Sequence, residues 1–586
     1  MKTLTAAIHE HATAAPADEA AIYVPDRPGS GTETVLTYGE LDLRACAVAE
    51  GLRERYPAAT RVLLLYPAGT EFLVGFTGCL YAGMLPVPAP LPAANNAGQL
   101  ARLDRIIAVA EPSAVLTDAA HLDRLTGELA HTGLAVAATD GDTGSDTHGG
   151  PADWQPPEAT PETPAFLQFT SGSTTDPKGV VISHANLESN LALMKKTFAL
   201  PEHPRLASWL PHYHDMGLIV VLLMALRYGG RASIMSPTGF LRDPFRWLEI
   251  IDKHGVHLSP APNFAYDLCV RRVDADRARE LDLSRWRVAI NGAEPVQRAT
   301  MAAFQERFGP AGLGAHVQCP CYGMAEVGVF ITGTPAGTPA TGLEVAAEAL
   351  ERNEFVPSAG NGPVRSLMSS GVTPPGFGTL VVDPDTREPL PDGRIGEIWL
   401  RGPSVGLGYW QDPETTAATF GGRTADGRGP YLRTGDLGVL TGDRLYLTGR
   451  LKELIIIHGR NLYPHDLEHH LRSLHPALAD GLTAAFAVPC QGTERIVVVH
   501  EAKAGDRELL AELGTAVKAG LSAFADASVA NVAFVGRGGI RRSTSGKIRR
   551  RYMRQLFMTA ELGAHWEDLE PAVRILYRIR AEQTAR

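Results

Sequence analysis

The sequence predicts an α/β fold of several subdomains, with a large N-terminal domain and a small C-terminal domain. The chain has 586 residues, which far exceeds what one hydrophobic core serves, so two or more domains are expected. Between residues 21 and 110, strand-like runs alternate with helical ones, which is typical of a parallel sheet with crossover helices. From residue 453 onward, a helix and strand-like runs indicate a second, smaller α/β domain.

The composition is that of an ordinary globular protein, with 20% charged and 44% hydrophobic residues. A net charge of -10 argues against nonspecific nucleic-acid binding. Six scattered cysteines predict a reducing cytoplasm rather than a disulfide framework. The first twenty residues carry acidic residues and histidines where a secretory signal has an apolar core, so they predict an amphipathic helix. The most apolar run, residues 217–226, is too short for a transmembrane segment and predicts a buried helix.

The N-terminal elements follow in order along the chain. The expected strands are residues 21–24 and 61–66, and the expected helices are residues 38–55 and 70–82. Four prolines between residues 86 and 92 predict an extended connection. Residues 140–164 are rich in Gly, Asp, Thr and Pro, so they predict a long surface loop, with a domain linker as the alternative.

Residues 169–184, FTSGSTTDPKGVVISH, predict a loop that holds phosphate groups. Small residues let backbone N–H groups approach phosphate oxygens, hydroxyls add donors, and Lys178 supplies positive charge. Strand-like runs on both sides, residues 165–169 and 180–182, make the loop a glycine-rich hairpin. It is not a Walker A loop, because Lys178 precedes Gly179 and a strand follows. An ordinary Ser/Thr/Gly surface loop is the alternative.

Two histidines, His212 and His214, precede the apolar run of residues 217–226. Further ligands at zinc spacing are absent, so a zinc site is not favoured, and His212 is expected to be structural. Farther on, the sequence Asn291-Gly292-Ala293-Glu294 ends a short strand-like run with small residues, against which a flat ring could lie.

The segment CYGMAEVG offers an aromatic face at Tyr322 for stacking and a carboxylate at Glu326 for a hard cation such as Mg²⁺. Asp436, in RTGDLG, has a carboxylate that could accept both ribose hydroxyls, although TGD alone is a common turn. Near the C-terminus, STSGKIRR places Lys547 on a Ser/Gly loop, where a basic run is ordinarily a solvated face. Arg549, Arg550 and Arg551 could also meet an acidic partner. Residues 555–586 are expected to be helical, with no role assigned.

Together these motifs resemble those of the adenylate-forming superfamily, which includes acyl-CoA synthetases, peptide-synthetase adenylation domains and luciferases. The loop of residues 169–184 is similar to the phosphate loop of that superfamily, with Thr175 at a usual glycine position. CYGMAEVG resembles the YGxTE motif, with Ala325 in the Thr place. Further segments make the chain look like a fatty acyl-AMP ligase: HDMGL, PNFAYDL, NGAEP, GRNLYP and an inserted patch at residues 342–362. This resemblance extends from the first helix to about residue 554.

The resemblance implies an AMP-binding domain at residues 1–450, a small mobile domain at residues 451–586 and a hinge at Lys452. It implies ATP and Mg²⁺ as cofactors, and Lys547, Glu326 and His214 as catalytic residues, with Glu326 also binding the metal. An apolar acyl pocket is expected at Phe240, Phe264 and Tyr266. The implied nucleotide-binding residues are Thr170, Ser171, Gly172, Ser173, Thr174, Lys178, Asn291, Gly292, Ala293, Tyr322, Gly323, Met324, Asp436 and Arg450.

The function implied is ATP-dependent activation of a fatty acid to acyl-AMP, followed by acyl transfer to the phosphopantetheine thiol of an acyl carrier protein. Such a reaction feeds lipid, polyketide or lipopeptide biosynthesis. The insertion is expected to pack against the small domain and disfavour reaction with CoA. An acyl-CoA ligase is the nearest alternative, but many of those have Lys where Ile456 stands. Amino-acid adenylation usually places an Asp where His214 falls. A noncatalytic nucleotide-binding module that docks carrier proteins is the most distant alternative.

Overall fold

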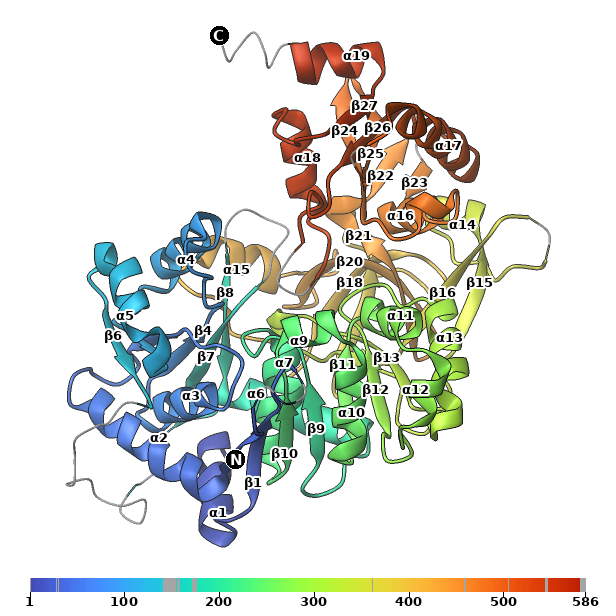
Figure 1. Ribbon diagram of the computed structural model, residues 1–586. Coiled ribbons are helices and arrows are strands. Elements are labelled where there is room, and N and C mark those ends of the chain that lie inside the picture. The colour runs from blue at the N-terminus through green and yellow to red at the C-terminus, as the bar shows by residue number, and fades with distance from the viewer. Residues whose placement is uncertain are drawn as a thin grey trace.

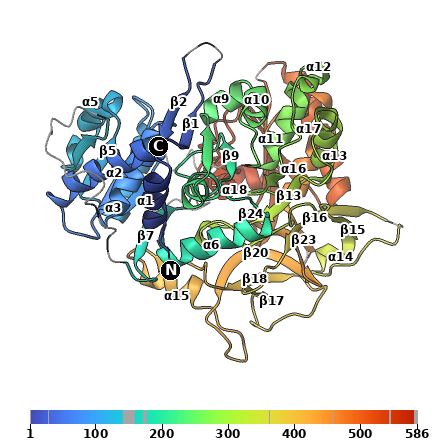
Figure 2. The ribbon, with the colours of Figure 1, turned by 90° about the horizontal axis from the view of Figure 1, so that it is seen from below.

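The computed structural model describes residues 2–579, except residues 28, 30, 141–153, 155–156, 158, 171–176, 361, 458–459, 504 and 543–545. The C-terminal helices and strands, orange to red in Figure 1, form a region beside a larger body made by the rest of the chain. Seen from below (Figure 2), α6 (His184–Thr197) lies between the blue N-terminal elements, the green helices α9–α13 and the orange strands β17, β18 and β20.

A four-stranded parallel sheet near the N-terminus confirms the predicted alternation of strands and helices. Its strand order is β4-β3-β5-β6. The strands are β3 (Arg61–Leu64), β4 (Leu85–Pro88), β5 (Ala114–Thr117) and β6 (Ala135–Ala138), and the helices of this part are α1 (Leu4–Ala14), α2 (Tyr38–Arg53), α3 (Glu71–Tyr81), α4 (Ala97–Ala110) and α5 (Ala119–Glu128). The proline-rich connection therefore includes a strand of this sheet.

The first predicted strand does not join this sheet. Strand β1 (Glu19–Tyr23) pairs in parallel with β10 (Arg231–Ile234) and antiparallel with β2 (Thr34–Thr37), so it belongs to a 14-stranded sheet. Because β10 is far from β1 in sequence, no local sequence pattern indicates that the two strands pair. The parallel part of the large sheet continues through β9 (Arg205–Ser208), β11 (Leu258–Ala261), β12 (Val288–Asn291) and β13 (Gln318–Tyr322).

The large sheet becomes antiparallel after β13, and this second part carries the strands that follow Glu326 in sequence. Its members are β14 (Thr332–Gly333), β15 (Gly342–Ala346), β16 (Val364–Val372), β17 (Gly378–Val382), β18 (Gly396–Arg401), β20 (Leu432–Thr441) and β21 (Arg444–Arg450). The helices along this stretch and before it are α9 (Pro237–Arg242), α10 (Phe245–Lys253), α11 (Asn263–Arg272), α12 (Ala275–Arg279), α13 (Arg298–Phe308), α14 (Ala347–Glu351) and α15 (Pro413–Phe420).

The predicted glycine-rich hairpin and buried helix are both present. Strands β7 (Pro164–Phe169) and β8 (Gly179–Ser183) pair antiparallel, and β19 (Gly408–Tyr409) adds a third strand beside β8. The apolar run folds as α7 (Asp215–Gly217), a π-helix (Leu218–Leu223) and α8 (Met224–Arg227), and residues 216–226 are all buried. Within the described part of the chain, no helix is long and apolar enough to cross a membrane.

The C-terminal region has its own four-stranded sheet, β24-β25-β26-β27. Its elements are β22 (Ile455–Ile457), β23 (Arg460–Leu462), α16 (Pro464–Leu471), β24 (Thr483–Cys490), β25 (Thr493–Glu501), α17 (Arg507–Ala525), β26 (Asn531–Val535), α18 (Arg550–Met558), β27 (Trp566–Asp568) and α19 (Pro571–Arg574). The expectation that residues 555–586 are helical is wrong at β27. Trp566 packs on Phe534, with ring centroids 5.1 Å apart, so tertiary contact decides the local conformation.

Candidate active site

Three of the predicted nucleotide-binding residues meet at one carboxylate. Asp436 of β20 lies directly opposite Arg450 of β21. Arg450 Nε donates to Asp436 Oδ1 at 2.7 Å, and Tyr322 Oη, at the end of β13, donates to Asp436 Oδ2 at 2.7 Å. Each carboxylate oxygen has a second lone pair, so Asp436 can still accept a hydrogen bond from a ribose hydroxyl.

The small residues predicted for the adenine side lie at the carboxyl ends of β12 and β13, the edge where open α/β sheets bind ligands. Asn291 is buried, and its Nδ2 donates to Asn263 Oδ1 at 3.3 Å. Ala293 has a φ of 66°, a conformation uncommon for a residue with a side chain. A Cβ on Gly323 would lie 1.6 Å from Val329 O, so only glycine fits between these backbones.

Glu326 and Lys178 are joined by a residue that the sequence analysis did not single out. Tyr409 Oη donates to Glu326 Oε1 at 2.8 Å, and Lys178 Nζ lies 4.8 Å from the centroid of the Tyr409 ring. Burial raises the pKa of Glu326, and the hydrogen bond from Tyr409 opposes that rise. Thr170 N donates to Lys178 O at 3.0 Å.

The central part of the phosphate loop cannot be placed. Ser171, Gly172, Ser173 and Thr174, with Thr175, lie outside the described residues. Their predicted contacts with phosphate groups stay predictions. Met324, another predicted nucleotide contact, is half-buried.

Lys547 is half-buried among acidic groups of the larger body. Burial lowers the pKa of its ammonium and Arg450 adds to the lowering, while the carboxylates of Asp215, Asp436 and Glu294 oppose it. The sequence analysis missed Asp215 and Glu294 because only the folded chain brings them to the lysine. This placement puts a cation beside the Asp436 cluster.

Gly546, next to Lys547, lies against Phe264 of helix α11. Gly546 has a φ of 85°, and a Cβ added there would lie 3.1 Å from Cε1 of Phe264. Nearby, His214 Nδ1 lies 2.7 Å from Asp215 Oδ1, at the start of α7. Burial alone would raise the pKa of Asp215, but His214 and Lys547 lower it below its ordinary value. His214 therefore favours the ionised form of Asp215, the carboxylate that interacts with Lys547.

The three residues predicted for the acyl pocket differ in their surroundings. Phe264 is half-buried and lies edge-on to Trp209, 5.9 Å between centroids. Phe240 is fully buried and stacks on Trp209 at 4.0 Å. Tyr266 is also fully buried, and its Oη donates to Ile290 O at 2.7 Å, so it is part of the hydrophobic core. Of the three, only Phe264 borders the Lys547 loop.

The insertion contacts the C-terminal region through a two-pronged ion pair. Arg460 of β23 donates from Nε and Nη2 to the Glu351 carboxylate of α14, at 2.8 and 2.9 Å. Asn461 Nδ2 adds a bond to Glu351 O at 3.2 Å. Beside these bonds, Leu350 of the insertion and Tyr463 belong to one buried apolar cluster. The insertion thus contacts the C-terminal region in the same arrangement in which Lys547 lies near Asp436.

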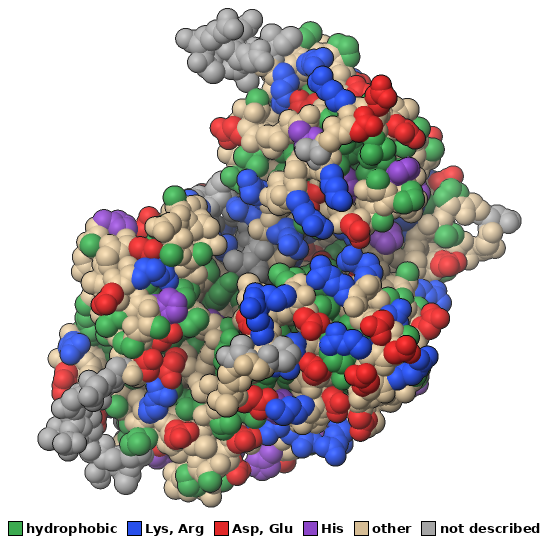
Figure 3. Space-filling model, viewed as in Figure 1, with side chains coloured by type: hydrophobic (Ala, Val, Ile, Leu, Met, Phe, Trp, Pro, Cys, Tyr) green, Lys and Arg blue, Asp and Glu red, His purple; other side chains and the backbone are tan. Residues whose placement is uncertain are grey.

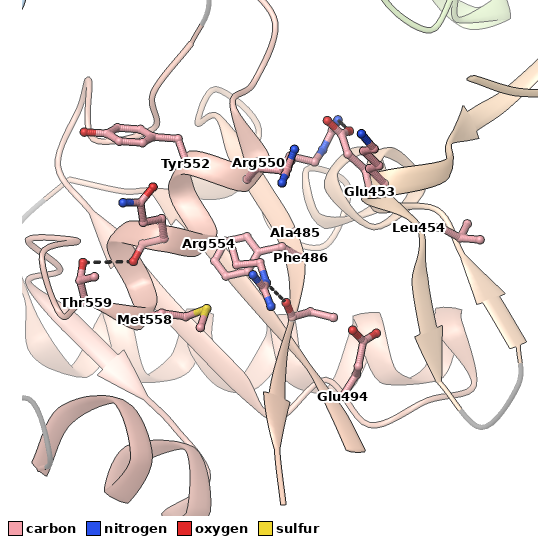
Figure 4. Close-up of a pocket in the computed structure, with 14 residues that line it drawn as sticks. Glu453, Leu454, Ala485, Phe486, Glu494, Arg550, Tyr552, Arg554, Met558 and Thr559 are labelled. Carbon is pink, nitrogen blue, oxygen red and sulfur yellow. Dashed lines mark hydrogen bonds and ion pairs between the residues drawn. The ribbon is translucent and has the colours of Figure 1, made fainter. Parts of the chain in front are cut away.

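The predicted hinge, Lys452, is exposed and borders a groove of about 780 Å³ between the hinge and α18, shown in Figure 4. Arg550 lies at this groove, with Nη1 2.6 Å from Glu453 and Nη2 2.7 Å from Glu468. Arg550 is therefore engaged within the C-terminal region. Arg549 stacks over Tyr552 at 4.7 Å, and Arg551 is exposed. Figure 3 shows Lys and Arg side chains around the hollow between the C-terminal region and the larger body.

The described residues contain no group of three or more His, Cys, Asp or Glu that could hold a metal ion. Burial lowers the pKa of His212 to about 3, and its ring packs on Phe72 at 4.3 Å, as expected for a structural histidine. Mg²⁺ characteristically binds one or two protein carboxylates together with substrate phosphates and water. The single Glu326 carboxylate beside the phosphate loop fits that mode.

Comparisons with known proteins identify the family of the chain. The AMP-binding enzyme family matches residues 8–410. The medium-chain-fatty-acid–[acyl-carrier-protein] ligase JamA of Moorena producens is 38% identical, over 91% of each chain. The long-chain-fatty-acid–AMP ligase FadD28 of Mycobacterium tuberculosis is 34% identical, over 94% of this chain and 97% of the other.

Solved structures show the same likeness. The fatty acyl-adenylate ligase of Legionella pneumophila, in complex with acyl adenylate and pyrophosphate, has a TM-score of 0.74 and 34% identity, and covers 97% of this chain and 98% of the other. A fatty acyl-adenylate ligase from studies of the Escherichia coli and L. pneumophila enzymes has a TM-score of 0.85 and 30% identity, and covers 96% and 98%. The chain is thus an adenylate-forming AMP-binding enzyme, and it belongs among the fatty acyl-AMP ligases. The predicted fold class is confirmed.

Proposed function

We propose that this protein activates a fatty acid with ATP and passes the acyl group to the phosphopantetheine thiol of an acyl carrier protein. The observation that carries the proposal is the position of Lys547, which the C-terminal region presents beside Asp436, Asp215 and Glu294 of the larger body. A cation in this position, next to the Asp436 carboxylate proposed to bind the ribose, suits reaction at the α-phosphorus of ATP. The acceptor is proposed from the insertion contact and from the name of the relative JamA.

In the first step, a fatty-acid carboxylate oxygen bonds to the α-phosphorus, and the bond from that phosphorus to the β-phosphate bridging oxygen breaks. Pyrophosphate leaves with the electron pair, so little covalent work falls to the protein. Asp436 would position the ribose with support from Arg450 and Tyr322, while Lys547 would stabilise the charge on the reacting oxygens. Positioning and charge stabilisation of this kind supply most of the rate in phosphoryl transfer.

Glu326 and Lys178 would hold the other end of ATP. Glu326 is the carboxylate proposed to hold Mg²⁺, whose charge would neutralise the leaving pyrophosphate. Tyr409 contacts both residues, because its ring face lies near Lys178 Nζ and its hydroxyl donates to the Glu326 carboxylate. Residues 170–174 are proposed to contact the β- and γ-phosphates.

In the second step, the carrier thiolate attacks the acyl carbonyl, the carbon–oxygen bond to AMP breaks, and AMP leaves. The lysine loop must withdraw so that the thiol can enter. We place the boundary between the moving parts after residue 450, with Lys452 as the hinge, because its exposed side chain can remain in solvent in both arrangements. Residues 1–450 and 451–586 would then rotate as units.

The ion pair between Glu351 and Arg460 would oppose withdrawal of the lysine loop for either thiol. We propose that a carrier protein, which can bind the protein surface, overcomes this contact more readily than free CoA. An acyl-CoA ligase is the alternative. A noncatalytic docking module is disfavoured, because it has no use for Lys547 among three carboxylates. The proposed location is the cytoplasm, in keeping with six cysteines that are all free thiols.

One competition assay tests the proposal. Fatty acids of several chain lengths, ATP, CoA and a phosphopantetheinylated carrier protein are supplied together, and mass spectrometry follows acyl-AMP and both thioesters. We expect acyl-AMP from at least one fatty acid and acyl transfer mainly to the carrier protein. Efficient acyl-CoA formation at equal thiol concentrations would identify an acyl-CoA ligase instead. Failure to form acyl-AMP from any of the acids would favour the remaining alternative, a noncatalytic module that docks carrier proteins.

A further inference from the structure

Tyr409 connects two functional groups from different motifs. Its hydroxyl donates to Glu326 Oε1 at 2.8 Å, and its ring face lies 4.8 Å from Lys178 Nζ. We propose that Tyr409 is a positioning residue for the ATP phosphates: its hydroxyl orients the Glu326 carboxylate, and its ring holds the Lys178 ammonium. This inference rests on the proposed function, because it takes Glu326 to hold the metal and Lys178 to contact phosphate.

The backbone around Tyr409 is fixed to the strand that follows the phosphate loop. Tyr409 pairs with Val180 in the register of β19 and β8. Trp410 N donates to Gly179 O at 2.7 Å. Tyr409 is thus held next to Lys178 by backbone pairing with β8, so a shift of β8 would move both residues together.

The same segment is also attached to Glu326. Gly406 N donates to Glu326 O at 2.8 Å, so the backbone of that residue is held as well as its side chain. Asn186 of α6 donates from Nδ2 to Pro403 O and Val405 O, both at 2.8 Å. Residues 403–410 therefore form a short bridge from α6, past Glu326, to the end of the phosphate loop.

Helix α15 also contacts Tyr409. Tyr409 N donates to Thr416 Oγ1 at 2.9 Å, and the ring meets Phe420 edge-on at 5.3 Å. These contacts fix the direction of the phenol, so its hydroxyl defines the orientation of the carboxylate plane. An aromatic face with a cation above it is a favourable electrostatic arrangement. Tyr409 thereby sets the spacing between the Glu326 carboxylate, proposed to bind a metal cation, and the Lys178 ammonium, proposed to bind phosphate.

The test compares Tyr409→Phe, which keeps the ring, with Tyr409→Leu, which removes ring and hydroxyl. Mn²⁺ binding is measured by electron paramagnetic resonance with a non-hydrolysable ATP analogue, and ATP–pyrophosphate exchange is measured against ATP and Mg²⁺. Tyr409→Phe should weaken Mn²⁺ binding by about tenfold or more, the usual effect of removing a group that orients a metal ligand. Tyr409→Leu should in addition raise the KM for ATP, because Lys178 loses its support.

Tyr81→Phe is the matched control. Tyr81 Oη also donates to a buried carboxylate, Asp42 Oδ1 at 2.6 Å, on the N-terminal helices. Its loss should change thermal stability but not Mn²⁺ binding. Thermal unfolding of each variant shows that it is folded.

Wild-type Mn²⁺ binding in folded Tyr409→Phe would overturn the inference. Glu326→Gln separates this failure from that of the proposed function. If Glu326→Gln weakens Mn²⁺ binding and Tyr409→Phe does not, the role of Tyr409 is refuted and the metal role of Glu326 stands. If Glu326→Gln leaves Mn²⁺ binding intact, the metal role of Glu326 is refuted, and the orienting role of the Tyr409 hydroxyl is refuted with it.

Discussion

Loosening the contact between the insertion and the C-terminal region should make CoA a better acceptor. Glu351 is 15% exposed and Arg460 is 31% exposed, so their pair lies between a surface and a buried ion pair. Exposed pairs contribute about 0.2–1 kcal/mol, and hydrogen bonds to charged groups about 1.5–3 kcal/mol. A two-pronged, partly buried pair should therefore stabilise the docked arrangement by about 1–2 kcal/mol.

That free energy fixes the size of the effect. If CoA reacts only when the C-terminal region has rotated away, Glu351→Gln raises the population of the reactive arrangement by about 5- to 30-fold. The assay supplies preformed acyl-AMP and CoA and measures the initial rate of acyl-CoA formation. Acyl-AMP synthesis should stay within about twofold, because the variant touches none of the groups around Lys547.

Asp526→Ala is a control at the same arginine. Arg460 Nη1 lies 3.0 Å from Asp526 Oδ2, but the Asp526 side chain is 90% exposed, so this pair should contribute little. Asp526→Ala should leave the CoA rate within about twofold of wild type. Arg460→Gln should match Glu351→Gln, and the double variant should exceed neither single variant by much. Unchanged CoA transfer in folded Glu351→Gln and Arg460→Gln would refute the idea that this pair excludes CoA.

Three further predictions concern the groups around the nucleotide. Lys547→Ala should slow acyl-AMP formation by at least about 10²–10³ and still transfer acyl groups from supplied acyl-AMP to the carrier protein, because the lysine loop has then withdrawn; equal loss of both steps contradicts this. Asp436→Ala should lower kcat/KM for ATP by about 10- to 100-fold in pyrophosphate exchange, and unaltered ATP kinetics would remove Asp436 from the site. Glu294→Gln removes a carboxylate that raises the pKa of Lys547, so the basic limb of the adenylation pH profile should shift to lower pH; an unshifted limb would show that Glu294 does not act on the lysine.

Much of the fold was predictable because local pattern and final structure agree. The alternation that predicts β3, α2 and α3 depends on apolar runs and helix periodicity, which need no distant partner. The sheet membership of β1 was not predictable, because its partner β10 lies about 200 residues away. Strand β27 was missed for the same reason, since its pairing with β26 and the Trp566 contact exist only in the folded chain.

The candidate site shows the same division. Asp436, Arg450 and Tyr322 were identified from separate motifs, and the structure joins them in one hydrogen-bonded cluster. Tyr409 lies 83 residues from Glu326 in a segment without an ionisable cluster, so nothing in its sequence neighbourhood indicates a link to that carboxylate. Glu294 was noted only as part of a turn of small residues.

The location of these groups on either side of the proposed hinge would explain how one site can serve two reactions. Asp436, Arg450 and Tyr322 all precede Lys452, so the cluster proposed to hold the ribose would stay intact if the C-terminal region moves as proposed. Lys547 follows the proposed hinge and would leave with that region. Burial lowers the pKa of Lys547, so its charged form is already disfavoured in the site. When Lys547 leaves, Asp436 would still accept the hydrogen bond from Arg450. The acyl-AMP can therefore remain anchored by its ribose while the charge needed only for its formation is withdrawn and the thiol enters.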